Sequence, residues 1–194
     1  MIKQKLNALL EKYPDLFVKK GDMPYDYDFE GFRCNDGWYA IVSKFCMHLQ
    51  SHNEHKEAEN RREWQANVDL FVKGMDDEQA AKARATFVYA PRVPIKITSV
   101  KEKFGTLSIY MNNPDEWAWG LATMADSMSA LFCEDCGTTH NVGAVQGGWI
   151  RNICEPCFKL MRESRPDRDE RWVVKRNPLL GPLATFQEMR EETS

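Results

Sequence analysis

Two Cys-x-x-Cys pairs constrain this chain more than any other feature of its sequence. Cys133 and Cys136 form the first pair, Cys154 and Cys157 form the second, and residues 137–153 separate them. A short turn lets two thiolates point at one ion, and a zinc ion takes four such ligands in a tetrahedron. The spacing therefore predicts a closed structural zinc site that maintains the local fold and performs no catalysis.

The residues beside the cysteines indicate how the chain folds around the ion. Gly137 follows the first pair, where a tight turn needs a residue that tolerates positive φ. Pro156 lies inside the second pair, where the helical pattern of residues 158–161 begins, and proline suits a first helical turn. Turn, hairpin, second turn and helix together predict a treble-clef zinc finger. Two disulfides, or four buried thiols, are the alternatives.

Composition places the chain among ordinary globular proteins. It has 194 residues, of which 43% are hydrophobic and 28% are charged, enough for one domain with a small zinc module. The net charge of −3 disfavours coating nucleic acid through bulk electrostatics. Residues 1–6 lack the apolar core of a signal peptide, and no apolar run approaches the length of a membrane span. We therefore expect a cytoplasmic protein without membrane contact, in a compartment where disulfides are rare.

Hydrophobic periodicity predicts several helices and one hairpin. The expected helices cover residues 2–12, 38 to about 52 with a polar continuation, 79–85, and 117–132, and the expected hairpin covers residues 94–111. Asn35 or Asp36 is the expected N-cap of the central helix, and Asp115 is that of the last helix. Gly105 is expected in the hairpin turn. A short strand is expected at residues 172–174.

These elements predict an α+β fold, with helices packed on a small antiparallel sheet. The expected division is a core domain over residues 1–130, a zinc module over 131–163 docked on the core, and an extended tail over 164–194. The tail carries apolar residues between Pro178, Gly181 and Pro182, so it is expected to dock. Docking on the chain's own core is one interpretation, and docking on a second copy, which would make a homo-oligomer, is the other.

A second metal site is one interpretation of the central helix. His48, His52, His55 and Glu59 fall on one helical face, with the three histidines within about 60° of one another. Such a face suits a divalent cation. A solvated stripe beside the apolar side of the helix is the alternative.

Three blocks of sequence carry a resemblance to a known family. They are Asn35-Asp-Gly-Trp-Tyr39, Val100-Lys-Glu-Lys-Phe-Gly-Thr-Leu107, and the cysteine block with Gly148-Trp-Ile-Arg151 before its second pair. Together they resemble a small, largely uncharacterised zinc-finger family of bacteriophages, prophages and bacterial genomes. The resemblance covers roughly residues 5–160 and implies a phage-related context without an assigned activity.

The leading functional hypothesis is a non-enzymatic protein that binds and modulates a host protein, such as a defence complex, a nuclease or a component of transcription. The alternative is nucleic-acid binding. The candidate contact residues for either partner are Lys101, Lys103, Trp149, Arg151, Arg162 and Arg165. Acidic residues offset much of the basic charge near the C-terminal end of this set, and the basic cluster of GATA-type fingers is absent between Cys136 and Trp149.

An enzyme is the third hypothesis. His140 and Asn141 lie between the cysteine pairs, where treble-clef nucleases place part of a His–Asn–His set. The sequence after Cys157 offers no histidine to complete that set. The predicted function is therefore binding, with catalysis as the weaker alternative.

Overall fold

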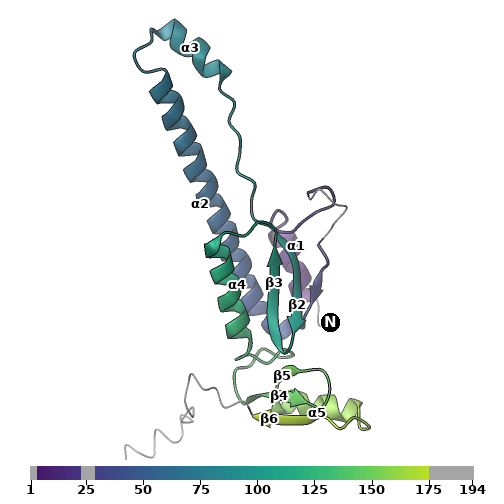
Figure 1. Ribbon diagram of the computed structural model, residues 1–194. Helices are drawn as coiled ribbons and strands as arrows, with labels where there is room; N and C mark the ends of the chain where they lie inside the picture. Colours follow the sequence, from purple (N-terminus) through teal and green to yellow (C-terminus); the bar gives the residue numbers. More distant parts are fainter. Residues whose placement is uncertain (1–3, 23–28, 175–194) are drawn as a thin grey trace, which may run out of the picture.

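A computed structural model of the protein describes residues 4–22 and 29–174 (Figure 1). Within these residues the chain forms five α-helices and two three-stranded sheets, so the predicted α+β class is confirmed. The expected tail beyond residue 174, with its apolar residues and its docking, lies outside the described residues.

The first sheet is built around the predicted hairpin. Strand β2 (Ile97–Lys103) pairs antiparallel with β3 (Thr106–Met111), and β1 (Phe32–Arg33) adds a parallel pair on the other edge of β2. Leu107 and Ile109 are buried while their neighbours face outward, as expected for a sheet with one covered face. The sheet is therefore mixed, because β1 joins the expected antiparallel hairpin in parallel.

Helix α2 (Tyr39–Phe71) is the longest element and begins differently from the prediction. A 3-10 turn over Asp36–Trp38 precedes it, Trp38 occupies the N-cap position, and no side chain caps the helix. The expectation of an Asn35 or Asp36 cap for this helix is wrong, because the 3-10 turn moves the start of α2 to Tyr39. Asn35 occupies the N-cap position of the 3-10 turn without a side-chain capping bond, and its amide N–H donates to Asp135 at 2.7 Å. The first half of α2 buries its apolar face against the sheet and against α1 (Gln4–Lys12).

The second half of α2 projects away from the sheet and carries α3 (Asp77–Thr86) at its far end (Figure 1). The expected central helix and its polar continuation are thus parts of one uninterrupted helix of 33 residues. Residues 87–96 return alongside α2. The Asn53 side chain donates to the Ile95 carbonyl at 2.9 Å and accepts from the Ile95 N–H at 3.0 Å. Polar side chains of α2 therefore satisfy the backbone of a segment that has no strand partner of its own.

Helix α4 (Glu116–Ser129) lies beside α2 and β3 (Figure 1). Asp115 caps it as predicted, because its carboxylate accepts from the Ala118 N–H at 2.9 Å. Ala118, Ala122 and Ala125 are buried against the core. Small side chains let the α4 backbone approach its neighbours closely.

The second sheet lies at the tip of the hairpin, beyond the end of α4 (Figure 1). Strand β4 (Val142–Gln146) is its central strand, flanked by β5 (Arg151–Cys154) and β6 (Arg171–Val174), and both pairings are antiparallel. Helix α5 (Glu155–Ser164) follows β5. The strand expected at residues 172–174 is confirmed as β6. Strand β6 belongs to this sheet, so the secondary structure of the expected zinc module, called the metal module below, continues beyond residue 163.

Candidate metal centre

The four cysteines come from two turns that the local sequence dictates. The Cys133 N–H donates to the Thr138 carbonyl at 2.7 Å, and the Cys133 carbonyl accepts from the Gly137 N–H at 2.9 Å. Gly137 has φ +80°, as its position after the first pair predicted. Cys154 ends β5 and Cys157 lies in the first turn of α5, with Pro156 between them. The β4–β5 hairpin lies between the two pairs in the sequence and brings the end of β5, with the second pair, beside the turn that holds the first pair.

The sulfur atoms of the four cysteines lie within 4.8 Å of one another. Sulfur atoms about 2.3 Å from a zinc ion form a tetrahedron with edges of about 3.8 Å. The Sγ atoms of Cys136 and Cys154 are 3.6 Å apart, close to that edge and far beyond a disulfide bond. All six cysteines of the chain are free thiols. The disulfide alternative is therefore wrong for this fold, and the four thiols fit one tetrahedral ion.

Backbone N–H groups add a second feature of a metal–thiolate site. Burial acts to raise the pKa of the Cys133 thiol, but the N–H groups of Cys136, Cys154 and Asp135 face its sulfur and hold its pKa below the ordinary value of 9.0. Cys133 and Cys154 are buried, Cys157 is half-buried and Cys136 is exposed. These donors stabilise the thiolate form of Cys133, which is the form that binds metal, whereas burial raises the pKa of the Cys136 and Cys157 thiols.

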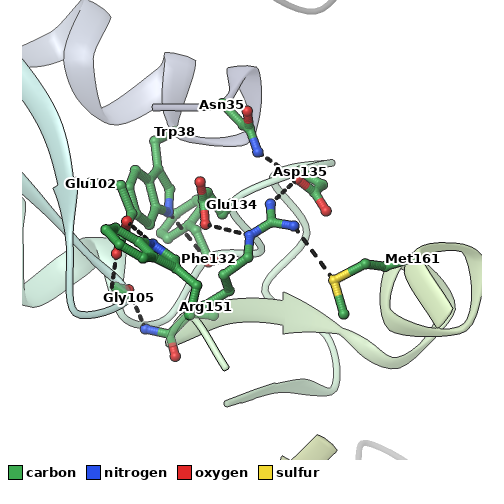
Figure 2. Close-up of polar contacts among 11 residues, drawn as sticks. Asn35, Trp38, Glu102, Gly105, Phe132, Glu134, Asp135, Arg151 and Met161 are labelled. Carbon is green, nitrogen blue, oxygen red and sulfur yellow. Dashed lines mark hydrogen bonds and ion pairs between the residues drawn. The ribbon is translucent and has the colours of Figure 1, made fainter. Parts of the chain in front are cut away.

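An ionic cluster lies against the first cysteine turn (Figure 2). The Arg151 guanidinium contacts the Glu134 carboxylate at 3.2 Å and the Asp135 carboxylate at 2.5 Å. Burial raises the pKa of Glu134 to about 7, although Arg151 opposes that shift. Arg151 was a candidate for contact with a partner. Its position between two carboxylates gives it an internal role, because it links β5 to the turn between the first two cysteines.

The core meets the metal module through backbone groups of the first cysteine turn. The Gly37 N–H donates to the Glu134 carbonyl at 2.9 Å. The Trp38 indole donates to the Phe132 carbonyl at 3.4 Å (Figure 2). A Cβ on Gly37 would lie 2.2 Å from the Cys133 carbonyl oxygen, so only glycine fits there. The Asp-Gly-Trp block therefore packs directly on the metal module.

The hairpin tip contacts the same module through Glu102 and Gly105. The Glu102 carboxylate accepts from the Gly105 N–H at 2.6 Å and from the Trp149 indole, while the Asn152 amide donates to the Gly105 carbonyl (Figure 2). All three blocks that carry the family resemblance thus converge on this junction. Sequence reasoning did not single out Asn152, Glu134 or Asp135, because none of them belongs to a recognisable local motif. The sequence signal that could have indicated this junction was the joint occurrence of the three blocks.

The other candidate contact residues come from β2, from the loop between β4 and β5, and from the end of α5. Lys101 forms an ion pair with Glu30 at 2.6 Å, and the ammonium groups of Lys101 and Lys103 lie 5.7 and 5.1 Å from the centre of the Tyr110 ring. The Arg162 guanidinium donates to the Arg168 carbonyl, and Arg165 is exposed at the end of α5. Trp149 is exposed, although its indole N–H is bound by Glu102. Lys101, Lys103 and Trp149 thus lie on or beside the β2–β3 hairpin, whereas Arg162 and Arg165 lie at the end of α5.

The histidines of α2 take different partners. His52 lies 2.7 Å from Asp115 and stacks on Trp117, His55 lies 3.2 Å from Glu59, and His48 is exposed. His140 is exposed in the turn before β4, where its backbone N–H donates to the Thr138 hydroxyl. Across residues 4–22 and 29–174, the four cysteines are the one group of three or more potential ligands close enough to share an ion. The arrangement on α2 therefore corresponds to separate side-chain pairs.

Comparisons of the chain with protein-family models, with curated proteins and with solved structures find no match. The resemblance to a phage-related family stays a prediction. In the part of the chain that the structure describes, no helix combines the length and the apolar character needed to cross a membrane.

Proposed function

We propose that this protein is a zinc-stabilised, non-enzymatic interaction protein that binds another protein through one face of α4. The observation that supports the proposal is a stripe of large apolar side chains left in solvent on that helix. The α4 stripe consists of Trp117, Leu121, Met124 and Met128. Trp117, Met124 and Met128 are exposed by 40–53%, and Leu121 is half-buried against the core.

The stripe is unusual because α4 turns its small residues inward. At about 100° per residue, the four stripe residues lie within about 60° of one another. The buried face, made by Ala118, Ala122, Ala125 and Ser129, points about 100° away. Complete burial of a side chain of the size of methionine stabilises a protein by about 1.5–3 kcal/mol, and this fold forgoes roughly half of that at three positions. Exposed apolar surface of this kind is typical of a protein-binding site.

The chemistry of the stripe favours a protein partner. Methionine and tryptophan are enriched at the centre of protein interfaces, where charged residues are depleted. Helix α4 carries two charged residues, Glu116 and Asp126, and neither belongs to the stripe. An uncharged, methionine-rich face suits an apolar surface of another protein and offers nothing to a phosphate backbone.

The metal has a structural role in this proposal. Four thiolates complete the tetrahedral coordination of zinc, so no position remains for a substrate or an activated water. The ion would hold the two cysteine turns together, and through them the junction with Gly37, Gly105 and the end of α4. The family resemblance adds the proposal that the chain is phage-encoded and acts in a host cytoplasm, on a defence or transcription component.

The test is affinity capture from a bacterial lysate with three forms of the full chain. Wild type and Thr123→Lys are expected to retain the same protein, and Met124→Lys is expected to retain at least about tenfold less of it. Thr123 is the matched control because it is exposed on the same helix, outside the stripe, and receives the same charge. Equal retention by all three forms contradicts the proposal. Retention that disappears after nuclease treatment supports the nucleic-acid alternative instead.

A further inference from the structure

We infer that Phe104, at the tip of the β2–β3 hairpin, is a binding anchor that inserts into an apolar pocket of a partner protein. The inference rests on the proposed function in that the ligand is a protein. It adds a second contact point, separate from the α4 stripe.

The hairpin loop has a backbone that phenylalanine does not favour. Lys103 pairs with Thr106, so Phe104 and Gly105 form a two-residue loop, and their φ angles are +51° and +81°. Positive φ at both loop positions defines a type I′ turn, in which Asn-Gly is the preferred pair. A bulky residue at positive φ is a genuine outlier. The turn would form more readily with asparagine at position 104.

Packing does not compensate for this backbone. The Phe104 side chain is 81% exposed, so it buries little apolar surface within the chain. Phe104 therefore lowers the stability of the fold in two ways: its backbone conformation is strained, and its ring gains little from burial. Such combinations occur where a residue is kept for binding.

The turn is also held rigidly. The Glu102 carboxylate binds the Gly105 N–H, the buried Asn152 amide binds the Gly105 carbonyl, and the Thr106 hydroxyl donates to the Lys103 carbonyl at 3.0 Å. Every one of these contacts fixes the loop backbone, and none engages the Phe104 ring. A side chain presented by a pre-organised backbone loses little entropy on binding.

Two further exposed apolar residues lie beside the tip. Trp149 is 67% exposed and contacts Glu102, and Ile150 has a methyl group 3.3 Å from where a Cβ on Gly105 would lie. An aromatic anchor with neighbouring apolar side chains is the usual composition of a binding hot spot. Phe104, Trp149 and Ile150 are called the tip cluster below.

The charges around the tip cluster favour a protein over single-stranded nucleic acid. Stacked bases bring phosphates that need cations close to the aromatic rings. The Trp149 indole is bound by a carboxylate, Arg151 is neutralised by Glu134 and Asp135, and the Lys103 ammonium lies over Tyr110 on the sheet. The occupant that suits the tip cluster is therefore an uncharged pocket.

The first arm of the test separates stability from binding. Phe104→Asn introduces the residue that the turn prefers, so the melting temperature of the full-length metal-bound protein should rise by about 2–4 °C. The same variant should bind its protein partner at least about tenfold more weakly. A lower melting temperature overturns the inference, because Phe104 would then be kept for stability.

The second arm identifies what the ring contacts. A photoreactive benzoylphenylalanine replaces Phe104, Met124 or, as an exposed control on α5, Leu160, and the bacterial lysate is irradiated. The inference expects a protein adduct at position 104, none at 160, and weaker capture of that same protein by Phe104→Asn. A protein adduct at 124 without one at 104 overturns the inference and leaves the proposed function standing. A protein adduct at 104 without one at 124 supports the inference and contradicts the proposed binding through the α4 stripe. A nucleic-acid adduct at 104 overturns the inference.

Discussion

The buried side-chain amide of Asn152 donates a hydrogen bond to the Gly105 carbonyl, so a strand of the metal module closes the hairpin turn of the core. The backbone carbonyl of the same residue accepts from the Glu134 N–H at 2.8 Å. One residue thus joins the hairpin tip, β5 and the turn between the first two cysteines. This geometry makes the metal module and the core parts of one structure.

Removing the Asn152 amide should therefore weaken the whole fold. Asn152→Ala leaves the Gly105 carbonyl without its protein donor, and we expect the free energy of unfolding to fall by about 1–2 kcal/mol. Urea denaturation measures the change. Ser127→Ala, on the exposed side of α4, is the control and should change stability by less than about 0.5 kcal/mol. A loss no larger than that of the control would show that the junction contributes little.

Loss of the metal should unfold the module. We expect one zinc ion per chain by elemental analysis, and Cys154→Ser should release it, because three thiolates leave the tetrahedron incomplete. Amide hydrogen exchange in β4 and β5 should then increase strongly, since a structural zinc ion supplies much of the folding free energy of such a small unit. Retention of the metal together with a cooperative melt in Cys154→Ser would contradict the assignment.

Acid should weaken the start of α4 through Asp115. Burial acts to raise the pKa of this carboxyl group, but the Ala118 N–H and the His52 side chain outweigh burial and hold its pKa below 3.8. A carboxyl group with a lowered folded-state pKa stabilises the fold above its unfolded pKa, and that stability is lost as the pH falls through the folded value. Stability should therefore decline below about pH 4.

Substitution with asparagine isolates this contribution. Asp115→Asn keeps an oxygen that can accept from the Ala118 N–H but removes the titrating charge, so its stability should depend less on pH below about 4. Thermal melts of both proteins between pH 2.5 and 6 provide the comparison. Parallel pH profiles would assign the acid sensitivity to other carboxylates.

The return segment beside α2 should depend on the asparagine that binds its backbone. Asn53→Ala removes both hydrogen bonds to Ile95, and we expect a loss of about 1–2 kcal/mol together with faster amide exchange near residue 95. Glu54→Ala, on the exposed side of the same turn, is the control. Unchanged exchange at residue 95 would mean that packing alone holds the segment.

Local sequence signals predicted the elements whose causes are local. Asp115 caps α4 because its carboxylate reaches an N–H three residues away, and Gly105 lies in the hairpin turn because the turn needs positive φ. The two thiol-bearing turns were predictable for the same reason, because the two residues between the cysteines of each pair let both thiols point at one ion from a single turn. The β6 strand was also visible in its run of apolar residues.

The sequence by itself therefore determined the α+β class, the hairpin and the identity of the four clustered thiols. Tertiary structure decided what those parts touch. Asn35 does not cap α2 because a 3-10 turn over Asp36–Trp38 separates it from the helix, and its amide N–H instead donates to Asp135, 100 positions away in the chain. Three of the four stripe residues of α4 stay about half exposed because the neighbouring face, made of alanines, packs on the core. Periodicity reports that a helix has an apolar face, but which face is buried depends on the shape of distant surfaces that meet only in the folded chain.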